Sequence, residues 1–277
     1  TALVLSLFIV GGSYVPPVLA AAESNEAATV AAENDSEEKA ALSVSDIVVI
    51  GILMKRQEFE SLPGRTGILS EKPLYSVIGE EVIIRDFFQD RKGGFFLDVG
   101  AADAIKGSNT YYLEKHLGWT GIGIDALIDY APGWKEHRPN STFANFLVTD
   151  QTGGEGVFYK SSSLGLSSTN KAMAGGKMFG GKEEPEEVRV PMITLSDLLD
   201  RAGVKKVDLV SMDIEGHEPK AFAGFDIERF APELLVVEGK NQSVKDYLAK
   251  HGYAPIERYK PFDKVNTYYE KAKEVAP

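Results

Sequence analysis

Residues 94–125 constrain the fold more than any other stretch of this chain. Residues 95–99 are a short apolar run that ends at a turn, which is typical of a buried strand. Residues 109–117 repeat apolar side chains at helical spacing and stop at Gly118, a residue that commonly ends helices. A second apolar run over residues 121–124 ends at an acid, Asp125. This order of strand, helix, strand and acid predicts the first half of a nucleotide-binding α/β sheet.

The turn after the first strand indicates what kind of ligand such a sheet would hold. Small residues there let the backbone approach a ligand, and Asp125 stands where these sheets place a carboxylate on ribose hydroxyls. The glycine spacing after Val99 does not match the dinucleotide pattern, which disfavours a nicotinamide dehydrogenase. Looser spacing with acids suits S-adenosyl-L-methionine (SAM), which carries a ribose and a cationic sulfonium and has no pyrophosphate.

Composition excludes several function classes. The 277 residues suffice for one α/β domain of ordinary size plus a tail. A net charge of -11 argues against nucleic acid as a partner. The chain has no cysteine, so thiolate catalysis, disulfides and thiolate metal sites are excluded.

The N-terminal part of the sequence divides into two segments before the domain. Residues 1–22 combine a short apolar core, a Gly/Pro break and small residues, which predicts a secretory signal peptide; an uncleaved membrane anchor is the alternative. Residues 23–45 contain six acids and almost no large apolar side chain, so we expect an acidic disordered linker. The domain then occupies residues 46–277.

The rest of the chain alternates helical and strand patterns. Such alternation predicts a mainly parallel, doubly wound α/β sheet with ligands at the carboxyl ends of its strands. Four acids directly follow apolar strand runs and should meet in one crevice: Asp98, Asp125, Asp213 and Glu238. Predicted strands cover residues 95–99, 121–124, 141–148, 156–160, 187–192, 207–212, 232–237 and a terminal pair at 253–259 and 265–269; predicted helices cover 79–90, 109–117, 194–202 and 243–251. The insertion 161–186 is expected to be either a lid or binding loop at the site or a merely mobile connection.

Three sequence segments together resemble the FkbM-type SAM-dependent methyltransferases. They are residues 94–101 with 107–110, residues 118–125, and residues 207–218 with the strand ending at Glu238. The resemblance spans roughly residues 75–270, in family order. It implies a class I methyltransferase (Rossmann-like) fold, with a mostly parallel seven-stranded sheet, helices on both faces and a C-terminal antiparallel hairpin. It also implies SAM as cofactor, and methyl transfer to a hydroxyl of a sugar, a glycan or a small natural product.

The resemblance also assigns cofactor-binding residues. Asp98 and Gly100 would shape the pocket for the methionine part of SAM, and Asp125 would hold the ribose hydroxyls. Asp213 would face the sulfonium and the acceptor. The remaining assignments place Ser108, Asn109 and Thr110 along the pocket at the start of the first helix, and Asp150 near the adenine.

Catalytic candidates follow the strand over residues 207–212. A hydroxyl acceptor needs a base, and His217 titrates nearest neutral pH. The hypothesis is that Asp213 positions donor and acceptor while His217 or Glu215 takes the proton. Glu215 could instead cap the following helix, and His217 could be a surface side chain. Asp213, Glu215 and Glu238 offer hard oxygen ligands, but their spacing is no recognised metal motif, so no metal is predicted.

Two functions remain in competition at this point. The first is a SAM-dependent O-methyltransferase acting on a glycan or small molecule. The second is an exported domain that keeps the fold, either without activity or with SAM binding only, because SAM is made in the cytoplasm. The expected location depends on the N-terminal segment. If it is cleaved as a signal, the protein is periplasmic or secreted; if it stays as an anchor, the protein is membrane-anchored with a cytoplasmic domain.

Overall fold

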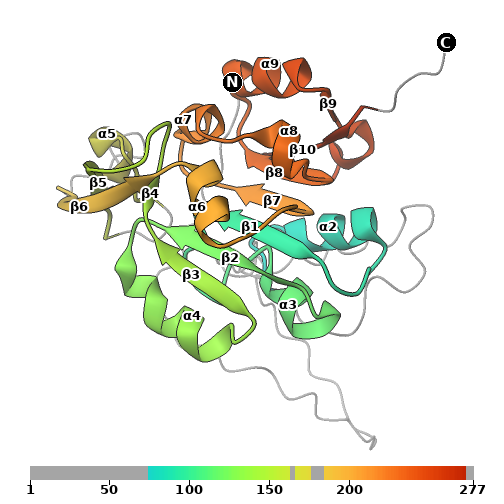
Figure 1. The fold of residues 1–277 in the computed structure, drawn as a ribbon, viewed down its shortest axis with the longest axis horizontal. Helices are drawn as coiled ribbons and strands as arrows, with labels where there is room; N and C mark the ends of the chain where they lie inside the picture. Colours follow the sequence, from blue (N-terminus) through green and yellow to red (C-terminus); the bar gives the residue numbers. More distant parts are fainter. Residues whose placement is uncertain (1–73, 163–165, 176–183, 273–277) are drawn as a thin grey trace, which may run out of the picture.

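A seven-stranded sheet forms the centre of the protein in the computed structural model, which describes residues 74–162, 166–175 and 184–272 (Figure 1). The strand order is β3-β2-β1-β7-β8-β10-β9, and every neighbouring pair is parallel except the two that involve β10. The strands are β1 (Phe95–Val99), β2 (Thr120–Asp125), β3 (Ser141–Asn145), β7 (Leu209–Met212), β8 (Leu234–Glu238), β9 (Tyr253–Pro255) and β10 (Asn266–Lys271). This architecture confirms the predicted class I fold with its C-terminal antiparallel hairpin.

Helices cover both faces of the sheet, and neighbouring side chains of each strand serve different faces. Phe96 packs with the first layer of helices, whereas Leu97 packs with the second, so consecutive apolar residues are both buried. The first layer holds α2 (Glu80–Phe88), α3 (Tyr111–Leu117) and α4 (Ala131–His137). The second holds α6 (Leu195–Arg201), α7 (Glu218–Ala223), α8 (Ile227–Phe230) and α9 (Gln242–Lys250).

A three-stranded sheet of order β4-β6-β5 extends from the main one (Figure 1). It contains β4 (Leu147–Val148), β5 (Glu155–Lys160) and β6 (Glu186–Ile193). The single strand predicted over 141–148 is therefore wrong, because the chain divides between two sheets at Phe146. The Asn145 amide donates to the carbonyls of Asp125 and Ala126, and Leu147 and Val148 then pair with β6 instead of β2. An amide side chain thus ends one ladder and lets the backbone change partner.

The predicted insertion contains a short helix, α5 (Lys171–Ala174), within its described part. Ser168 forms an isolated antiparallel bridge with Tyr159 of β5, with both backbone hydrogen bonds made. The Asn170 side chain accepts a bond from the Ala172 amide and caps α5. This part of the insertion is thereby attached to the small sheet.

The predictions for residues 1–22 and 23–45 lie outside the described residues. Over the part of the chain that the structure describes, no helix is both long enough and apolar enough to cross a membrane. The topology locates the site. β1 lies between β2 and β7: the chain first adds β2 and β3 on one side of β1, and later adds β7 and β8 on the other side. Ligands of doubly wound sheets bind at the carboxyl ends of the strands at such a reversal.

Candidate cofactor and catalytic site

The turn after β1 lies directly against the end of β7. Gly100 has φ +83°, and a Cβ placed on it would sit 1.8 Å from the backbone oxygen of Asp213. The Asp213 amide also donates to the Val99 carbonyl at 3.0 Å. Only glycine permits this approach, because any side chain would overlap the neighbouring backbone. The contact brings the carboxyl end of β1 to that of β7, as the sequence predicted for the acids at those ends.

Asp98 at the end of β1 is almost fully buried. Its Oδ2 accepts a hydrogen bond from the Thr110 hydroxyl at 2.6 Å, and its exposed fraction is 5%. Burial raises the pKa of Asp98 to about 6, although the Thr110 hydrogen bond and the nearby Arg138 charge both lower it. Asp98 is therefore ionised at neutral pH and can attract a cationic ligand.

The three polar residues that precede α3 do different things. Ser108 and Thr110 are buried, and their hydroxyls bond within the protein, where both accept hydrogen bonds from the Arg138 guanidinium. Asn109 is half-buried; its amide donates to the Ser211 hydroxyl at 3.0 Å. The Asn109 Oδ1 is a buried acceptor with no hydrogen-bond partner among the described residues. Of the three side chains, Asn109 is the one left with a group to offer a ligand.

Arg138 is a residue that the sequence did not single out. It follows α4, and its side chain is fully buried against Thr110 and Glu114. Its partners precede it by 24 to 34 positions, so no local pattern marks it. The sequence around Arg138 does not distinguish it from a solvated surface arginine that follows a helix.

Asp125 at the end of β2 receives the turn that follows β1. Its Oδ2 accepts from the Ala102 amide at 3.0 Å, and its Oδ1 accepts from the Leu127 amide at 2.8 Å. Ala102 has φ +43°, a conformation that non-glycine residues adopt only when their surroundings impose it. Burial raises the pKa of Asp125 to about 6, and these amide bonds oppose that rise. Each oxygen still has a lone pair for a ligand hydroxyl.

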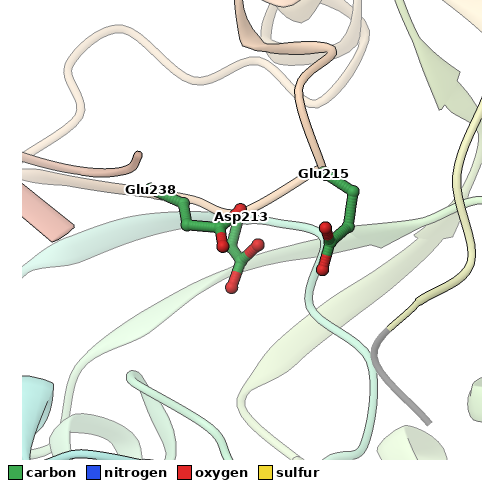
Figure 2. A group of neighbouring side chains, drawn as sticks. All are labelled: Asp213, Glu215 and Glu238. Carbon is green, nitrogen blue, oxygen red and sulfur yellow. The ribbon is translucent and has the colours of Figure 1, made fainter. Parts of the chain in front are cut away.

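Three carboxyl groups converge at the ends of β7 and β8. Asp213, Glu215 and Glu238 each contribute an oxygen, and these oxygens all lie within 4.8 Å of one another (Figure 2). Asp213 remains accessible to solvent, yet enough protein surrounds its carboxyl group to raise its pKa well above the usual value, and Glu238 raises it further. Water therefore reaches the Asp213 carboxyl, while the surrounding protein and acids disfavour its charged form. The prediction that no metal binds here stays a prediction.

Glu215 and Glu238 belong to the same electrostatic group as Asp213. Burial raises the pKa of Glu215 to about 8, with Asp213 and Glu218 contributing repulsion. Burial also raises the pKa of Glu238. Asp213 and Glu238 are close enough to share a proton, so the pair rather than either residue titrates. With one shared proton, the Asp213–Glu238 pair carries a single negative charge that no basic residue offsets among the main influences on it, which favours cationic or neutral ligands and repels anions.

His217 is held between the segment after β7 and the insertion. Its Nδ1 lies 3.2 Å from the Thr169 hydroxyl, and its Nε2 is buried without a hydrogen-bond partner among the described residues. Burial lowers the pKa of His217, and the neighbouring Lys220 lowers it further. His217 is consequently neutral at physiological pH and able to accept a proton. It is half-buried, with an exposure between that of a core side chain and that of a surface side chain.

Glu218 and Asp150 stabilise the segment around His217. The buried Glu218 carboxylate accepts from the backbone amides of Ile214 and Gly216, and so holds the turn before α7 in place. Asp150 forms an ion pair with Lys220 at 2.7 Å. Its position at the end of β4 is thus tied to α7, and its predicted contact with adenine stays a prediction.

An apolar pocket of about 390 Å³ lies elsewhere, among β2, β3 and α6. Its lining includes Phe95, Ile122, Phe146 and Leu198. None of the four strand-end acids lines it, so it is separate from the candidate chemistry.

The residues at the strand ends fit SAM. Asp125 offers acceptors for ribose hydroxyls, and Asp98 and Asp213 offer negative charge for a sulfonium or an ammonium group. The buried unpaired Asn109 Oδ1 supplies an acceptor for a donor group of a ligand. The close backbone approach at Gly100 keeps the turn free of side-chain bulk.

Comparisons with solved structures find methyltransferases at low identity. A TehB-like SAM-dependent methyltransferase from Corynebacterium glutamicum is 15% identical with TM-score 0.38, and the match covers 80% of this chain and 99% of that one. A precorrin-6y C5,15-methyltransferase from Geobacter metallireducens is 12% identical with TM-score 0.37, covering 72% and 89%. The 1,6-didemethyltoxoflavin-N1-methyltransferase of Burkholderia thailandensis, solved with its substrate and S-adenosylhomocysteine, is 10% identical with TM-score 0.34, covering 86% and 97%.

Sequence comparison identifies the family. No curated protein matches the chain. The profile of the methyltransferase FkbM domain matches residues 98–255, which is more than half of the chain and runs from Asp98 at the end of β1 to the end of β9. The match includes all four strand-end acids. The chain therefore belongs to the FkbM family of SAM-dependent methyltransferases.

Proposed function

We propose that this protein transfers the methyl group of SAM to a hydroxyl oxygen of an uncharged sugar, glycan or small natural product. The observation that carries the proposal is the convergence of the Asp213, Glu215 and Glu238 carboxyl groups (Figure 2). His217 lies on the same segment after β7 as Asp213 and Glu215. This group lies at the same carboxyl edge of the sheet as the cofactor candidates Asp98 and Asp125. The acidic group would therefore bind the methyl acceptor next to the bound cofactor.

The charge of the site supports an uncharged acceptor. The carboxyl pKa values there are raised by burial and by other acids, and no basic residue is among the main influences on Asp213, Glu215 or Glu238. A phosphorylated or carboxylated acceptor would meet repulsion in a poorly solvated place. Neutral hydroxyls, by contrast, can donate hydrogen bonds to these carboxylates.

When bound, SAM supplies an electrophilic methyl group whose S–C bond breaks as the acceptor oxygen attacks, leaving the electron pair on sulfur. The protein has to align the acceptor oxygen with that bond and remove the hydroxyl proton. His217 suits the second task because its lowered pKa keeps it neutral and its Nε2 has no competing partner among the described residues. Glu215 suits it less near neutral pH, because a pKa of about 8 leaves it protonated. Asp213 would then position the donor and acceptor.

Calorimetry with the full chain tests the cofactor side first, by titration with SAM. Transfer of a labelled methyl group is then measured to a panel of neutral sugars and polyols, matched with their phosphorylated counterparts. We expect SAM binding, and methylation of oxygen in neutral acceptors only. Absence of SAM binding, or methylation confined to nitrogen or to anionic acceptors, would overturn the proposal. SAM binding without transfer to any acceptor would favour the alternative of an exported domain that binds SAM without turnover.

We also propose that the chain is exported through its N-terminal apolar segment, residues 1–22. The support is the order of apolar core, break and small residues in the sequence. Fractionation of the producing cells, with sequencing of the mature N-terminus, tests this. A protein retained in the cytoplasmic fraction with residues 1–22 intact would overturn it, and an intact N-terminus in the membrane fraction would favour the anchor.

A further inference from the structure

Arg138 is a charged side chain in the interior, and each part of its guanidinium is paired. Its Nε donates to Glu114 at 2.6 Å, and one terminal nitrogen donates to the Ala104 carbonyl at 3.2 Å and the Ser108 hydroxyl at 3.3 Å. The other terminal nitrogen donates to the Thr110 hydroxyl at 3.0 Å. Its side chain has no solvent exposure. A buried charge is tolerated only with such complete pairing.

The direction of the hydrogen bonds between Arg138 and Asp98 is fixed by chemistry. A guanidinium can only donate, so the Thr110 oxygen must accept from Arg138. The single Thr110 proton is then free for Asp98 Oδ2, 2.6 Å away, which as a carboxylate can only accept. The chain therefore runs from Arg138 through Thr110 to Asp98. Bonds arranged in this way polarise one another in a poorly solvated interior.

We propose that Arg138 is a positioning residue for the cofactor, which holds Asp98 in its binding orientation through the hydroxyl of Thr110. This inference rests on the proposed function, because it assumes that Asp98 contacts the cationic part of SAM. It gives Thr110 a different role from the one the family resemblance implies. Thr110 is fully buried and orients another residue, whereas the resemblance places it in contact with SAM.

The geometry of Asp98 supports this role over one of simple packing. Thr110 engages Oδ2, and Oδ1 makes no hydrogen bond to any described residue. One oxygen is thus anchored while the other is left to a ligand. Arg138 is itself held in place by the Glu114 carboxylate, which also accepts from the Asn140 amide and the Ser141 hydroxyl. The Arg138 guanidinium is therefore fixed in position and does not move toward a bound ligand.

The test is the pH dependence of SAM affinity, measured by calorimetry on the full chain. Thr110→Val removes the hydroxyl at nearly constant volume, and Thr110→Ser keeps it. Thr120→Val makes the same exchange at an exposed threonine of β2 as a matched control. Affinity should fall as Asp98 becomes protonated, and Thr110→Val should raise the midpoint by about one pH unit. Thr110→Val should also weaken binding at pH 7 about tenfold, whereas Thr110→Ser and Thr120→Val should resemble the wild type.

Other charges near Asp98 come from three elements: Asp125 on β2, Arg138 after α4, and Asp213 after β7. All are retained in the Thr110 variants, so a difference in midpoint between valine and serine reports the hydroxyl. Should the valine variant fail to fold, Arg138→Lys replaces it, because lysine keeps the charge but loses the planar fork. If the wild-type protein binds SAM but Thr110→Val does not move the midpoint, this inference alone is overturned. If the wild-type protein does not bind SAM, the proposed function is overturned as well.

Discussion

The Thr169 hydroxyl lies 3.2 Å from Nδ1 of His217, and so joins the insertion to the segment that follows β7. Ser168, the preceding residue, directs its own hydroxyl to the Glu215 carbonyl at 3.4 Å. Two consecutive side chains of the insertion therefore contact the two residues that are candidate bases, Glu215 through its backbone carbonyl and His217 through its imidazole. The described part of the insertion is a wall of the candidate site, which favours the first of the two roles expected from the sequence.

We expect His217→Ala to lower kcat about 100-fold without weakening SAM binding, because it removes a proton acceptor and no cofactor contact. Thr169→Val should lower kcat less, about threefold to tenfold, because the imidazole remains but loses its orienting partner. Methyl-transfer kinetics and calorimetry measure the two effects. His251→Ala is the matched control, since His251 pairs with Glu228 away from these residues. Full turnover of both His217→Ala and Glu215→Gln would exclude either residue as the base.

The pH profile of the same reaction has a defined sign. Burial lowers the pKa of His217, and Lys220 lowers it further, so the neutral form dominates at neutral pH. Turnover that depends on this base should therefore be present at pH 7 and fall only when the pH drops below the lowered pKa. A profile of kcat that first rises near pH 8 would instead point to Glu215, whose pKa is raised to about 8.

We expect the protein to be less stable at pH 8.5 than at pH 5.5. Burial raises the folded-state pKa of Asp98 and Asp125 to about 6, of Glu80 to about 7 and of Glu215 to about 8. Groups of this kind stabilise the fold fully below their unfolded pKa, and the contribution is lost as pH rises through the folded pKa. Thermal unfolding across this range measures the effect, and a rising Tm would contradict it.

Asp213→Asn isolates one member of that acidic group. The amide removes a charge that Glu238 repels, so the variant should unfold about 2 °C higher than wild type at pH 8.5, with a smaller difference at pH 5.5. It should also lose most methyl transfer, since Asp213 is the candidate for aligning donor and acceptor. An equal gain at both pH values would show that charge is not the cause.

Gly100→Ala should destabilise the protein by roughly 3 kcal/mol or more, because the new Cβ would overlap the Asp213 backbone oxygen and no flexible side chain can yield. Gly118→Ala is the matched control. Gly118 also has positive φ, but nothing lies within 4 Å of its added Cβ, so about 1 kcal/mol is expected. Urea denaturation measures both. Equal losses would mean that backbone strain, and not the contact between β1 and β7, explains the cost.

Most of the fold could be predicted from local patterns. The strands that contain Asp98 and Asp125, the helix that ends at Gly118 and the helix capped by Thr194 all form where their residues indicate. The strand over 141–148 was one exception, because an apolar run continues through Phe146 while the backbone changes partner. That change depends on contacts between Asn145 and the end of β2, some 20 residues earlier. The strand predicted over 253–259 was another, since it ends at Pro255 and a 3-10 turn over Glu257–Tyr259 follows.

The sequence by itself determined the alternation of strands and helices, the acids at the strand ends and the family. These features depend on neighbouring residues, whose spacing directly sets backbone conformation and burial. Only the tertiary structure decided that Asp213, Glu215 and Glu238 face one another, that His217 meets Thr169 and that hydrogen bonds link Arg138 to Asp98 through Thr110. Those relationships join residues far apart in the chain. Their chemistry depends on desolvation and on distances of a few ångströms, which exist only once the strands and loops have packed.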